Sequence, residues 1–303
     1  MVFILFQPVL LEDKEVIDEF LHSNPSESSN CNFTNFYMWR KPYHIEWTVV
    51  DDCLCVKASH HGQTYLLPPV ANKGGNIDKA LVAILRYFEE MGEQFMLKGV
   101  TVESKAVLEA LRPGNFQFVS DRDNFDYVYL AEDLIGLKGR KYSSKKNHLN
   151  YFKRTYSQYQ YLSITNDLLP SCLETALEWY DLRGLDEESE IELEKAAVID
   201  LLNHYEVLGL SGGAILIDGK MEAFTIGEQL TSNMALVHIE KGNPNIRGVY
   251  QAINQEFCRD RWSDMKYINR EEDMGMEGLR QAKESYHPVK LVEKYDAFMA
   301  LKE

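Results

Sequence analysis

The chain lacks any hydrophobic run that approaches the roughly 18 residues needed to cross a membrane. The apolar stretch 2–6 has no basic flank and is followed by acids at Glu12 and Asp13, which does not fit a signal peptide. Cysteine is also scarce, and no pair has the spacing of a zinc site or a redox motif. The cysteines are Cys31, Cys53, Cys55, Cys172 and Cys258. We therefore expect a cytoplasmic protein with reduced thiols, without a membrane span and without a metal site.

Positive charge is in short supply as well. The chain has 32 Lys and Arg residues against 47 Asp and Glu residues, a formal net charge of -15 and a pI near 5.0. Proteins that coat DNA or a membrane surface carry a basic face, so DNA is not expected as a partner and any contact with an anion should be local. The sequence also lacks the spacing of a Ser/His/Asp triad and of a phosphate-binding P-loop, which disfavours hydrolase, kinase and metalloenzyme activities.

The length and the order of secondary structure indicate two domains. With 303 residues, 45% of them hydrophobic and 12% aromatic, the chain can bury two cores of ordinary size. In the first half, residue periodicity predicts a helix at 13–23, strands at 44–50, 54–59 and 65–70, a helix from Asn76, a strand at 95–100, a helix at 104–111 and strands at 116–119 and 127–130. The second half repeats this order, with helices at 168–183 and 188–208, strands at 214–217, 222–228 and 235–241, a helix at 248–262, a strand at 265–269, a helix at 276–285 and a strand at 289–295.

Antiparallel strands followed by helix, strand, helix and strand are typical of an α+β fold whose sheet is divided at its centre. We expect two such domains, each with a mixed, mostly antiparallel sheet that is flanked by helices. The expected ranges are 1–134 for the first domain, 135–158 for a basic connecting helix and 159–303 for the second domain.

The segment 138–156 departs from the acidic character of the chain, because it holds seven Lys or Arg residues and no acid in nineteen residues. If it is helical, Lys141, Lys145 and His148 share one side, and apolar residues between 149 and 156 form a stripe on another. Such a helix would offer cations to the phosphates of a tRNA acceptor end, a nucleotide-linked precursor or a lipid headgroup. The expected anion-binding residues are Arg140, Lys141, Lys145, Lys146, Asn147 and His148. The alternative is a solvated connecting helix.

Three stretches of the sequence resemble a known family. They are Phe33-Thr34-Asn35-x-Tyr37-x-Trp39-Arg40, the basic stretch 142–148 with its Lys-Lys-Asn-His run, and Asn269-x-Glu271-x-Asp273-x-Gly275-x-x-Gly278-Leu279-x-x-Ala282-Lys283-x-x-Tyr286-His287-Pro288. These residues are similar to those of soluble relatives of the C-terminal domain of phosphatidylglycerol lysyltransferase. That group is similar in turn to the Fem-type peptidyltransferases that use aminoacyl-tRNA. The order of elements resembles the GNAT-type N-acyltransferase fold, present twice, which implies two GNAT-like domains.

The resemblance implies a donor-binding turn at 242–248, between a strand and the next helix. In GNAT-type domains this turn offers backbone N–H groups to the pyrophosphate of acyl-CoA, and several glycines leave room for it. Here Gly242 and Gly248 bracket the turn and Pro244 removes one donor, which disfavours acetyl-CoA and agrees with aminoacyl-tRNA as donor. The implied donor-binding residues are Asn243, Arg247, Gly248 and Asn269. A tight turn without a ligand is the alternative.

The C-terminal stretch supplies candidate catalytic residues. Aminoacyl transfer needs a base to take a proton and a cation or N–H donor for the developing oxyanion. Glu271 or Asp273 is the candidate base, or binds the α-ammonium group of the donor, and Lys283 is the candidate partner of the oxyanion. The alternatives are that Asp273 caps the helix after Gly275 and that Lys283 pairs with an acid.

The leading hypothesis is an acyltransferase that moves an aminoacyl group to an amine or hydroxyl acceptor bound in a cleft near the basic helix. Aminoacyl-tRNA or acyl-CoA would be the co-substrate, and tRNA or a phosphate-bearing small molecule would be the partner. The alternatives are an acetyl-CoA-dependent N-acetyltransferase and a non-catalytic module that holds an anionic ligand. Fold alone does not decide among them, whereas a donor-dependent product would.

Overall fold

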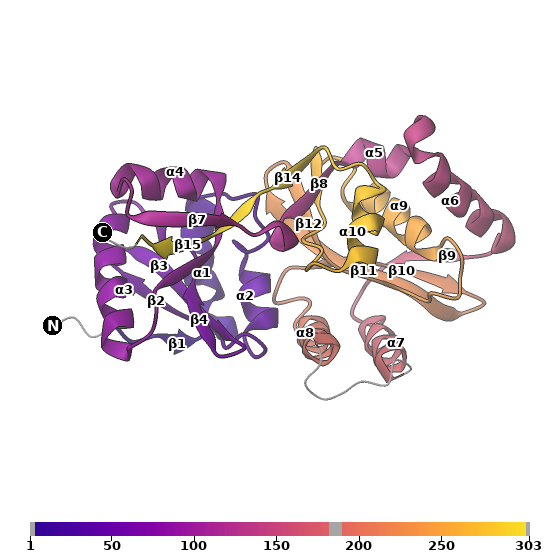
Figure 1. The fold of residues 1–303 in the computed structure, drawn as a ribbon. Helices are drawn as coiled ribbons and strands as arrows, with labels where there is room; N and C mark the ends of the chain where they lie inside the picture. Colours follow the sequence, from indigo (N-terminus) through magenta and orange to yellow (C-terminus); the bar gives the residue numbers. More distant parts are fainter. Residues whose placement is uncertain (1–3, 182–189, 301–303) are drawn as a thin grey trace. The chain divides into compact units, whose positions relative to one another are not determined.

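The computed structural model describes residues 4–181 and 190–300, and these form two compact units. One unit comprises the described residues up to Phe125 and those from Val292 onward, and the other comprises those from Asp126 to Leu291. This division differs from the expected one, because the basic segment lies within the second unit and the end of the chain belongs to the first (Figure 1). The cause is that each sheet takes one strand from the other half of the sequence.

The first unit is built on a mostly antiparallel sheet. Its strands are β1 (Gln7–Pro8), β2 (Glu46–Val50), β3 (Cys53–His60), β4 (Gln63–Leu66), β5 (Val70–Ala71), β6 (Met96–Thr101), β7 (Phe116–Ser120) and β15 (Lys294–Met299). Its helices are α1 (Lys14–Ser23), α2 (Phe33–Trp39), α3 (Ile77–Met91) and α4 (Val102–Leu111), with 3-10 turns at Leu11–Asp13 and Arg122–Asn124. The strand order is β1-β2-β3-β4-β6-β15-β7, and β5 pairs with β3. β4 and β6 run parallel, and β15 lies between β6 and β7.

The amphipathic helix α3 anchors the core of the first unit. Asn76 caps its start, because the side-chain oxygen accepts the N–H of Lys79, and Gly92 ends it in the left-handed conformation. The buried side of α3 joins a core that includes residues of β3 and β6. Its buried residues are Ala80, Leu81, Ile84 and Phe88.

The second unit repeats this plan. Its strands are β8 (Asp126–Leu130), β9 (Gln160–Ser163), β10 (Ser211–Ile217), β11 (Lys220–Thr231), β12 (Met234–Gly242), β13 (Tyr267–Asn269) and β14 (Lys290–Val292). Its helices are α5 (Ala131–Gly136), α6 (Ser143–Thr155), α7 (Leu169–Asp181), α8 (Glu190–Asn203), α9 (Val249–Arg261) and α10 (Glu277–Glu284), with a 3-10 turn at Arg140–Tyr142. The strand order is β14-β8-β13-β12-β11-β10-β9, so β8 lies beside β13 as β15 lies beside β6.

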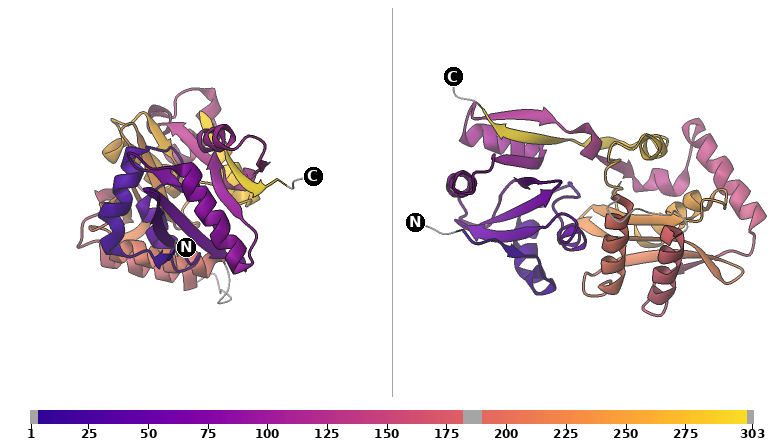
Figure 2. Two further views of the ribbon diagram at one scale, coloured as in Figure 1. Left: turned by 90° about the vertical axis from the view of Figure 1, so that its left-hand side faces the viewer. Right: turned by 60° about the horizontal axis from the view of Figure 1, so that its bottom comes forward.

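Helices cover both faces of the second sheet (Figures 1 and 2). On one face, α5, α6 and α9 share a core with the sheet, in which Ala223 of β11 takes part. The next residue, Phe224, points to the opposite face because side chains alternate along a strand. There α7 packs against β11, and the ring of Trp179 stacks on Phe224 with 6.0 Å between centroids and 8° between planes. α8 packs beside α7.

β12 and β13 run parallel and part after a short contact. They pair from Met234 with Tyr267 to Leu236 with Asn269, and β12 then continues to Gly242 beyond the end of β13. The second sheet therefore opens at its centre, as the order of elements predicts.

Several expected elements need correction. The strand expected at 289–295 is two strands, β14 and β15, that lie in different sheets, and the strand expected at 65–70 is divided between β4 and β5. The helix α2, the helix α5 and the edge strand β9 were not predicted. The expected helix ends between 182 and 189 lie outside the described residues. In the described part of the chain, no helix combines the length and the apolar character that a membrane span requires.

Candidate functional site

The candidate site lies in the second unit, where β12 separates from β13. A β-bulge occurs there, because His238 is inserted between the pairs that Val237 and Ile239 make with β11. Gly227 permits the close approach of the two strands, since a Cβ at this position would lie 2.3 Å from the carbonyl oxygen of Leu236. The bulge therefore takes His238 out of the regular alternation at the point where the sheet opens.

The imidazole of His238 lies between two carboxylates and is not exposed to solvent. Its Nε2 is 2.8 Å from Oε1 of Glu228 on β11, and its Nδ1 is 3.0 Å from Oε1 of Glu271 in the loop after β13. Burial alone would lower the pKa of His238, but the two carboxylates outweigh it and raise the pKa to about 9. The ring is therefore a buried cation that fixes the carboxylate of Glu271.

Two cations and one carboxylate form a second cluster at the same opening. Arg270, the residue after β13, donates from Nη2 to Oε1 of Glu240 at 2.8 Å, and Asn254 of α9 donates to Oε2 at 3.1 Å. Lys145 of α6 holds its Nζ 4.2 Å from the ring centroid of Tyr286, and the guanidinium of Arg270 lies 5.0 Å from the same centroid. Because one acid faces two cations, the cluster has an excess of positive charge.

The polar atoms of this cation cluster are not all satisfied. Burial, together with the charge of Arg270, lowers the pKa of Lys145 to about 8, and Glu240 offsets part of this effect. Within the described ranges, Nη1 of Arg270 and Oδ1 of Asn254 are buried without a hydrogen-bond partner. A buried donor without an acceptor is costly, so a ligand that supplies one would be stabilised here.

A network of hydrogen bonds fixes the loop between β13 and α10. Oδ1 of Asn269 accepts the N–H of Glu271 at 2.7 Å, and its Nδ2 donates to Asp126 at 3.1 Å. Lys283 of α10 donates to the carbonyl oxygens of Arg270 and Glu271, and burial lowers its pKa to about 8. Glu271 has a φ of 56°, a left-handed conformation that is strained for Glu and that this network stabilises.

Asp273 closes the same loop. Its unexposed carboxylate accepts from the hydroxyl of Tyr127 at 2.5 Å, from Nε and Nη2 of Arg280 at 2.9 and 2.8 Å, and from the N–H of Gly275 at 2.9 Å. Burial alone would raise the pKa of Asp273, but these donors, with Arg280 the strongest, lower it to about 2. All three catalytic candidates from the sequence therefore lie around one loop, and each is engaged in hydrogen bonds.

The structure divides the predicted anion-binding residues between two environments. α6 begins at Ser143, so Lys141 lies in the preceding 3-10 turn and does not share a helical face with Lys145. Lys145 is directed inward to the cation cluster, while Leu149 and Phe152 form the predicted buried stripe. Among the remaining candidates, His148 is half-buried, and the exposed ones are Arg140, Lys141, Lys146 and Asn147.

The turn between β12 and α9 uses its backbone N–H groups internally. Asn243 donates its N–H to the carbonyl oxygen of Glu222 at 2.9 Å and its Nδ2 to the carboxylate of the same residue at 2.8 Å. The N–H groups of Asn245 and Ile246 donate to Asn243, each at 3.0 Å. Since Pro244 has no N–H, the turn has few donors left for a phosphate.

α6 covers the start of α9. Gly248, which precedes α9, has a φ of 89°, and a Cβ there would lie 2.3 Å from the carbonyl oxygen of His148. The guanidinium of Arg247 lies 4.6 Å from the ring centroid of Tyr151 on α6. The predicted donor-binding residues Arg247 and Gly248 thus lie against the predicted anion-binding helix, whereas Asn269 is the last residue of β13.

Five residues of the site were not nominated from the sequence. They are Glu228, His238, Glu240, Asn254 and Arg270. A weak signal was present, because β12 carries charged and polar residues within an otherwise apolar strand. Arg270 lies inside the C-terminal stretch but at a position that the resemblance leaves unspecified.

The sequence matches one protein family over most of its length. Residues 23–298 match the family described as phosphatidylglycerol lysyltransferase, C-terminal. A curated relative, an uncharacterized protein of Mycoplasmoides gallisepticum, is 23% identical over 171 residues, which are 56% of this chain and 54% of that protein. The chain thus spans about half the length of this relative.

Solved structures of similar fold cover nearly the whole chain. A conserved protein of unknown function from Bacteroides thetaiotaomicron is 37% identical, with a TM-score of 0.90 and coverage of 98% of this chain and 100% of that one. L-PGS from Bacillus licheniformis is 13% identical, with a TM-score of 0.68 and coverage of 96% and 93%. A tandem GNAT protein from the clavulanic acid biosynthesis pathway is 10% identical, with a TM-score of 0.51 and coverage of 99% of each chain. The predicted GNAT-like α+β fold is thereby confirmed, and family and fold together support an acyltransferase.

Proposed function

Because this chain belongs to the family of phosphatidylglycerol lysyltransferase C-terminal domains, we propose that it transfers an aminoacyl group from an aminoacyl-tRNA to an amine or hydroxyl acceptor. The observation that carries the proposal is that Arg270, with a buried Nη1 that has no partner among the described residues, and Lys145, with a pKa lowered to about 8, meet where β12 and β13 part. Acyl transfer builds negative charge on a carbonyl oxygen, and a fixed cation in a water-poor site favours it.

The proposed reaction exchanges one acyl bond for another. The acceptor atom forms a bond to the aminoacyl carbonyl carbon, the ester bond to the tRNA ribose breaks, and one proton moves from the acceptor to the ribose oxygen. Arg270, oriented by Glu240, offers Nη1 to the carbonyl oxygen. Lys145, whose pKa is lowered to about 8, takes the proton of the acceptor as a neutral amine and passes it to the leaving oxygen.

The loop after β13 has a positioning role in this proposal. Lys283 binds the carbonyl oxygens of Arg270 and Glu271, while Asn269 and Asp273 fix the loop on either side. These residues would hold Arg270 in place and would not contact the reacting atoms.

The exposed part of the basic segment would bind phosphates of the tRNA. Its exposed cations lie on α6, which carries Lys145, and on the 3-10 turn that precedes it, so one continuous segment would join the phosphate contacts to the reaction site. The residues proposed for this role are Arg140, Lys141, Lys146, Asn147 and His148, with Arg247 beside them. Coenzyme A is disfavoured as donor, because the turn at Asn243 uses its N–H groups internally and α6 covers Gly248.

A transfer assay tests the proposal. Radiolabelled aminoacyl-tRNA is the donor, phosphatidylglycerol vesicles or soluble hydroxyl and amine compounds are the acceptors, and acetyl-CoA replaces the donor in a parallel arm. We expect transfer from aminoacyl-tRNA and a fall in kcat of about 100-fold or more in Lys145→Met, because this variant keeps the length of the side chain but carries no titratable amine. Lys266→Met, at an exposed lysine of the same unit, is the matched control and should keep the wild-type rate. An unchanged kcat in Lys145→Met, or transfer from acetyl-CoA alone, would refute the proposal.

A further inference from the structure

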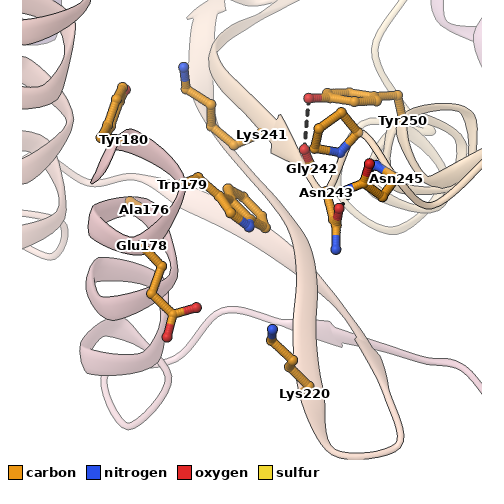
Figure 3. A pocket seen from close by; sticks show the side chains of 11 residues that line it. Ala176, Glu178, Trp179, Tyr180, Lys220, Lys241, Gly242, Asn243, Asn245 and Tyr250 are labelled. Carbon is orange, nitrogen blue, oxygen red and sulfur yellow. Dashed lines mark hydrogen bonds between the residues drawn. The ribbon is translucent and has the colours of Figure 1, made fainter. Parts of the chain in front are cut away.

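A cavity of about 380 Å³ lies at the carboxyl end of β12, on the side of α7 (Figure 3). α7, the first residue of β11, the end of β12 and the turn before α9 all contribute to its wall. The residues that matter here are Glu178, Trp179, Lys220, Lys241 and Tyr250. The volume is in the range of small-molecule sites. Neither Lys145 nor Arg270 lines this cavity, so it is separate from the cation cluster.

Two aromatic side chains of the cavity wall are held in place by neighbouring groups. Trp179 comes from α7 and is held by its parallel stack on Phe224, at 6.0 Å between centroids. Tyr250 is held by the hydrogen bond from its hydroxyl to the carbonyl oxygen of Gly242 at 2.8 Å. Rings that are fixed in this way lose little freedom when a flat heterocycle packs against them, which is how proteins bind nucleobases.

The charged side chains of the cavity are not equivalent. Nζ of Lys241 binds Glu194 of α8 at 2.6 Å, so much of its charge is compensated. Lys220 is exposed and, in the part of the chain that the structure describes, has no ion pair. Glu178 is also exposed and presents a carboxylate, an acceptor for hydroxyl groups. The cavity thus combines an aromatic wall, one available cation and one hydroxyl acceptor.

We propose that this cavity binds a nucleoside phosphate, with the base against Trp179, the phosphate at Lys220 and the ribose hydroxyl groups at Glu178. The inference rests on the proposed function, because the adenosine at the 3′ end of an aminoacyl-tRNA is such a group, and coenzyme A carries another. Lys241 in the cavity and Glu240 in the cation cluster are neighbours on β12, about 3.3 Å apart along the strand. Because consecutive side chains of a strand point to opposite faces, the cavity lies on the α7 face of the sheet and the cation cluster lies on the α9 face, both near the end of β12.

Binding of small nucleotides to the full chain tests the inference. Isothermal titration calorimetry with AMP and adenosine measures the contribution of the phosphate. We expect AMP to bind about tenfold more tightly than adenosine, and Trp179→Leu to weaken AMP binding about tenfold or more. Lys220→Gln should remove most of the preference for AMP over adenosine. Lys266→Gln, at an exposed lysine outside the cavity, should change neither affinity.

The source of the nucleotide is distinguished by competition. Displacement of AMP by the trinucleotide CCA supports the tRNA end as the ligand, whereas displacement by coenzyme A and not by CCA contradicts it. AMP that fails to bind at about 5 mM, or that binds Trp179→Leu and Lys220→Gln as it binds the wild type, overturns the inference. Because Lys220 is exposed, Lys220→Gln keeps the test valid even if Trp179→Leu does not fold.

The two proposals fail in different ways. A wild-type protein that transfers aminoacyl groups but does not bind AMP refutes the role of the cavity and leaves the proposed function. A protein that binds AMP and transfers nothing refutes the proposed function and leaves the cavity as a nucleotide site.

Discussion

Replacement of Asp273 by Asn tests what stabilises the loop that carries Arg270. Arg280, Tyr127 and the N–H of Gly275 lower the pKa of Asp273 from 3.8 to about 2. The difference between these values corresponds to about 2 kcal/mol of stability at pH 7, because one pKa unit is worth about 1.4 kcal/mol. Since the folded-state pKa is the lower one, this stability is present above about pH 4 and is lost as the pH falls through about 2.

Urea unfolding at two pH values measures this contribution. At pH 7, Asp273→Asn should lower the free energy of unfolding by about 2 kcal/mol or more. At pH 3, where about half of the contribution is gone, the difference from the wild type should narrow by about 1 kcal/mol. Asp264→Asn, at an exposed acid of the same unit, is the control and should stay within about 0.5 kcal/mol of the wild type. If the free energies of unfolding of Asp273→Asn and the wild type differ by the same amount at both pH values, the charge of the carboxylate has no such role.

Three further predictions concern the site. Gly248→Ala should lower the free energy of unfolding by about 2 kcal/mol or more, because the added Cβ would clash with a carbonyl oxygen of α6. Gly219→Ala is the control, since Gly219 has a φ of 81° and open space around it, so only backbone strain should appear. Equal losses for the two variants in urea unfolding would show that the clash with α6 contributes nothing. His238→Gln should cost about 3 kcal/mol at pH 7, because it removes the cation between two carboxylates. The pKa of His238 is raised to about 9, so the difference from the wild type should shrink as the pH rises through 9, and a constant difference would argue against a charged imidazole. Finally, the transfer rate should rise through about pH 8 as Lys145 loses its proton, and a pH–rate profile of Lys145→Met that keeps this inflection would assign the base elsewhere.

Local patterns predicted most helices and strands because the interactions that form them are local. α3 follows from its apolar spacing, from the Asn76 cap and from Gly92, all within one segment. The strands expected at 214–217 and 222–228 likewise correspond to β10 and β11, a hairpin that turns at Asp218 and Gly219. The edge strand β9 was not predicted, because a short, exposed strand lacks a clear alternation of apolar and polar residues.

The exchange of strands between the two halves of the chain could not be predicted from the sequence. The segment 289–295 reads as one strand, but Lys290–Val292 and Lys294–Met299 pair in different sheets. Nothing local distinguishes these partners, because pairing depends on which distant strand is present at the sheet edge. The expected domain boundaries at 134 and 158 differ from the observed ones for the same reason.

The candidate functional site could likewise be predicted from the sequence only in part. Composition and resemblance led to the basic segment and to the loop from Asn269 to Lys283, and these do supply Lys145 and the supports of Arg270. Which lysine points inward depends on the start of α6 at Ser143, and the sequence placed that start too early.

The sequence by itself determined the acidic balance of the chain, the isolated basic segment, most helices and strands, and the resemblance to an acyltransferase family, because each of these is encoded within a few tens of residues. Only the tertiary structure decided that His238 lies between Glu228 and Glu271, that Arg270 and Lys145 both lie at the ring of Tyr286, and that a cavity forms beside Trp179. Charge and pKa in these places depend on burial and on neighbours far apart in the chain, and folding brings those neighbours together.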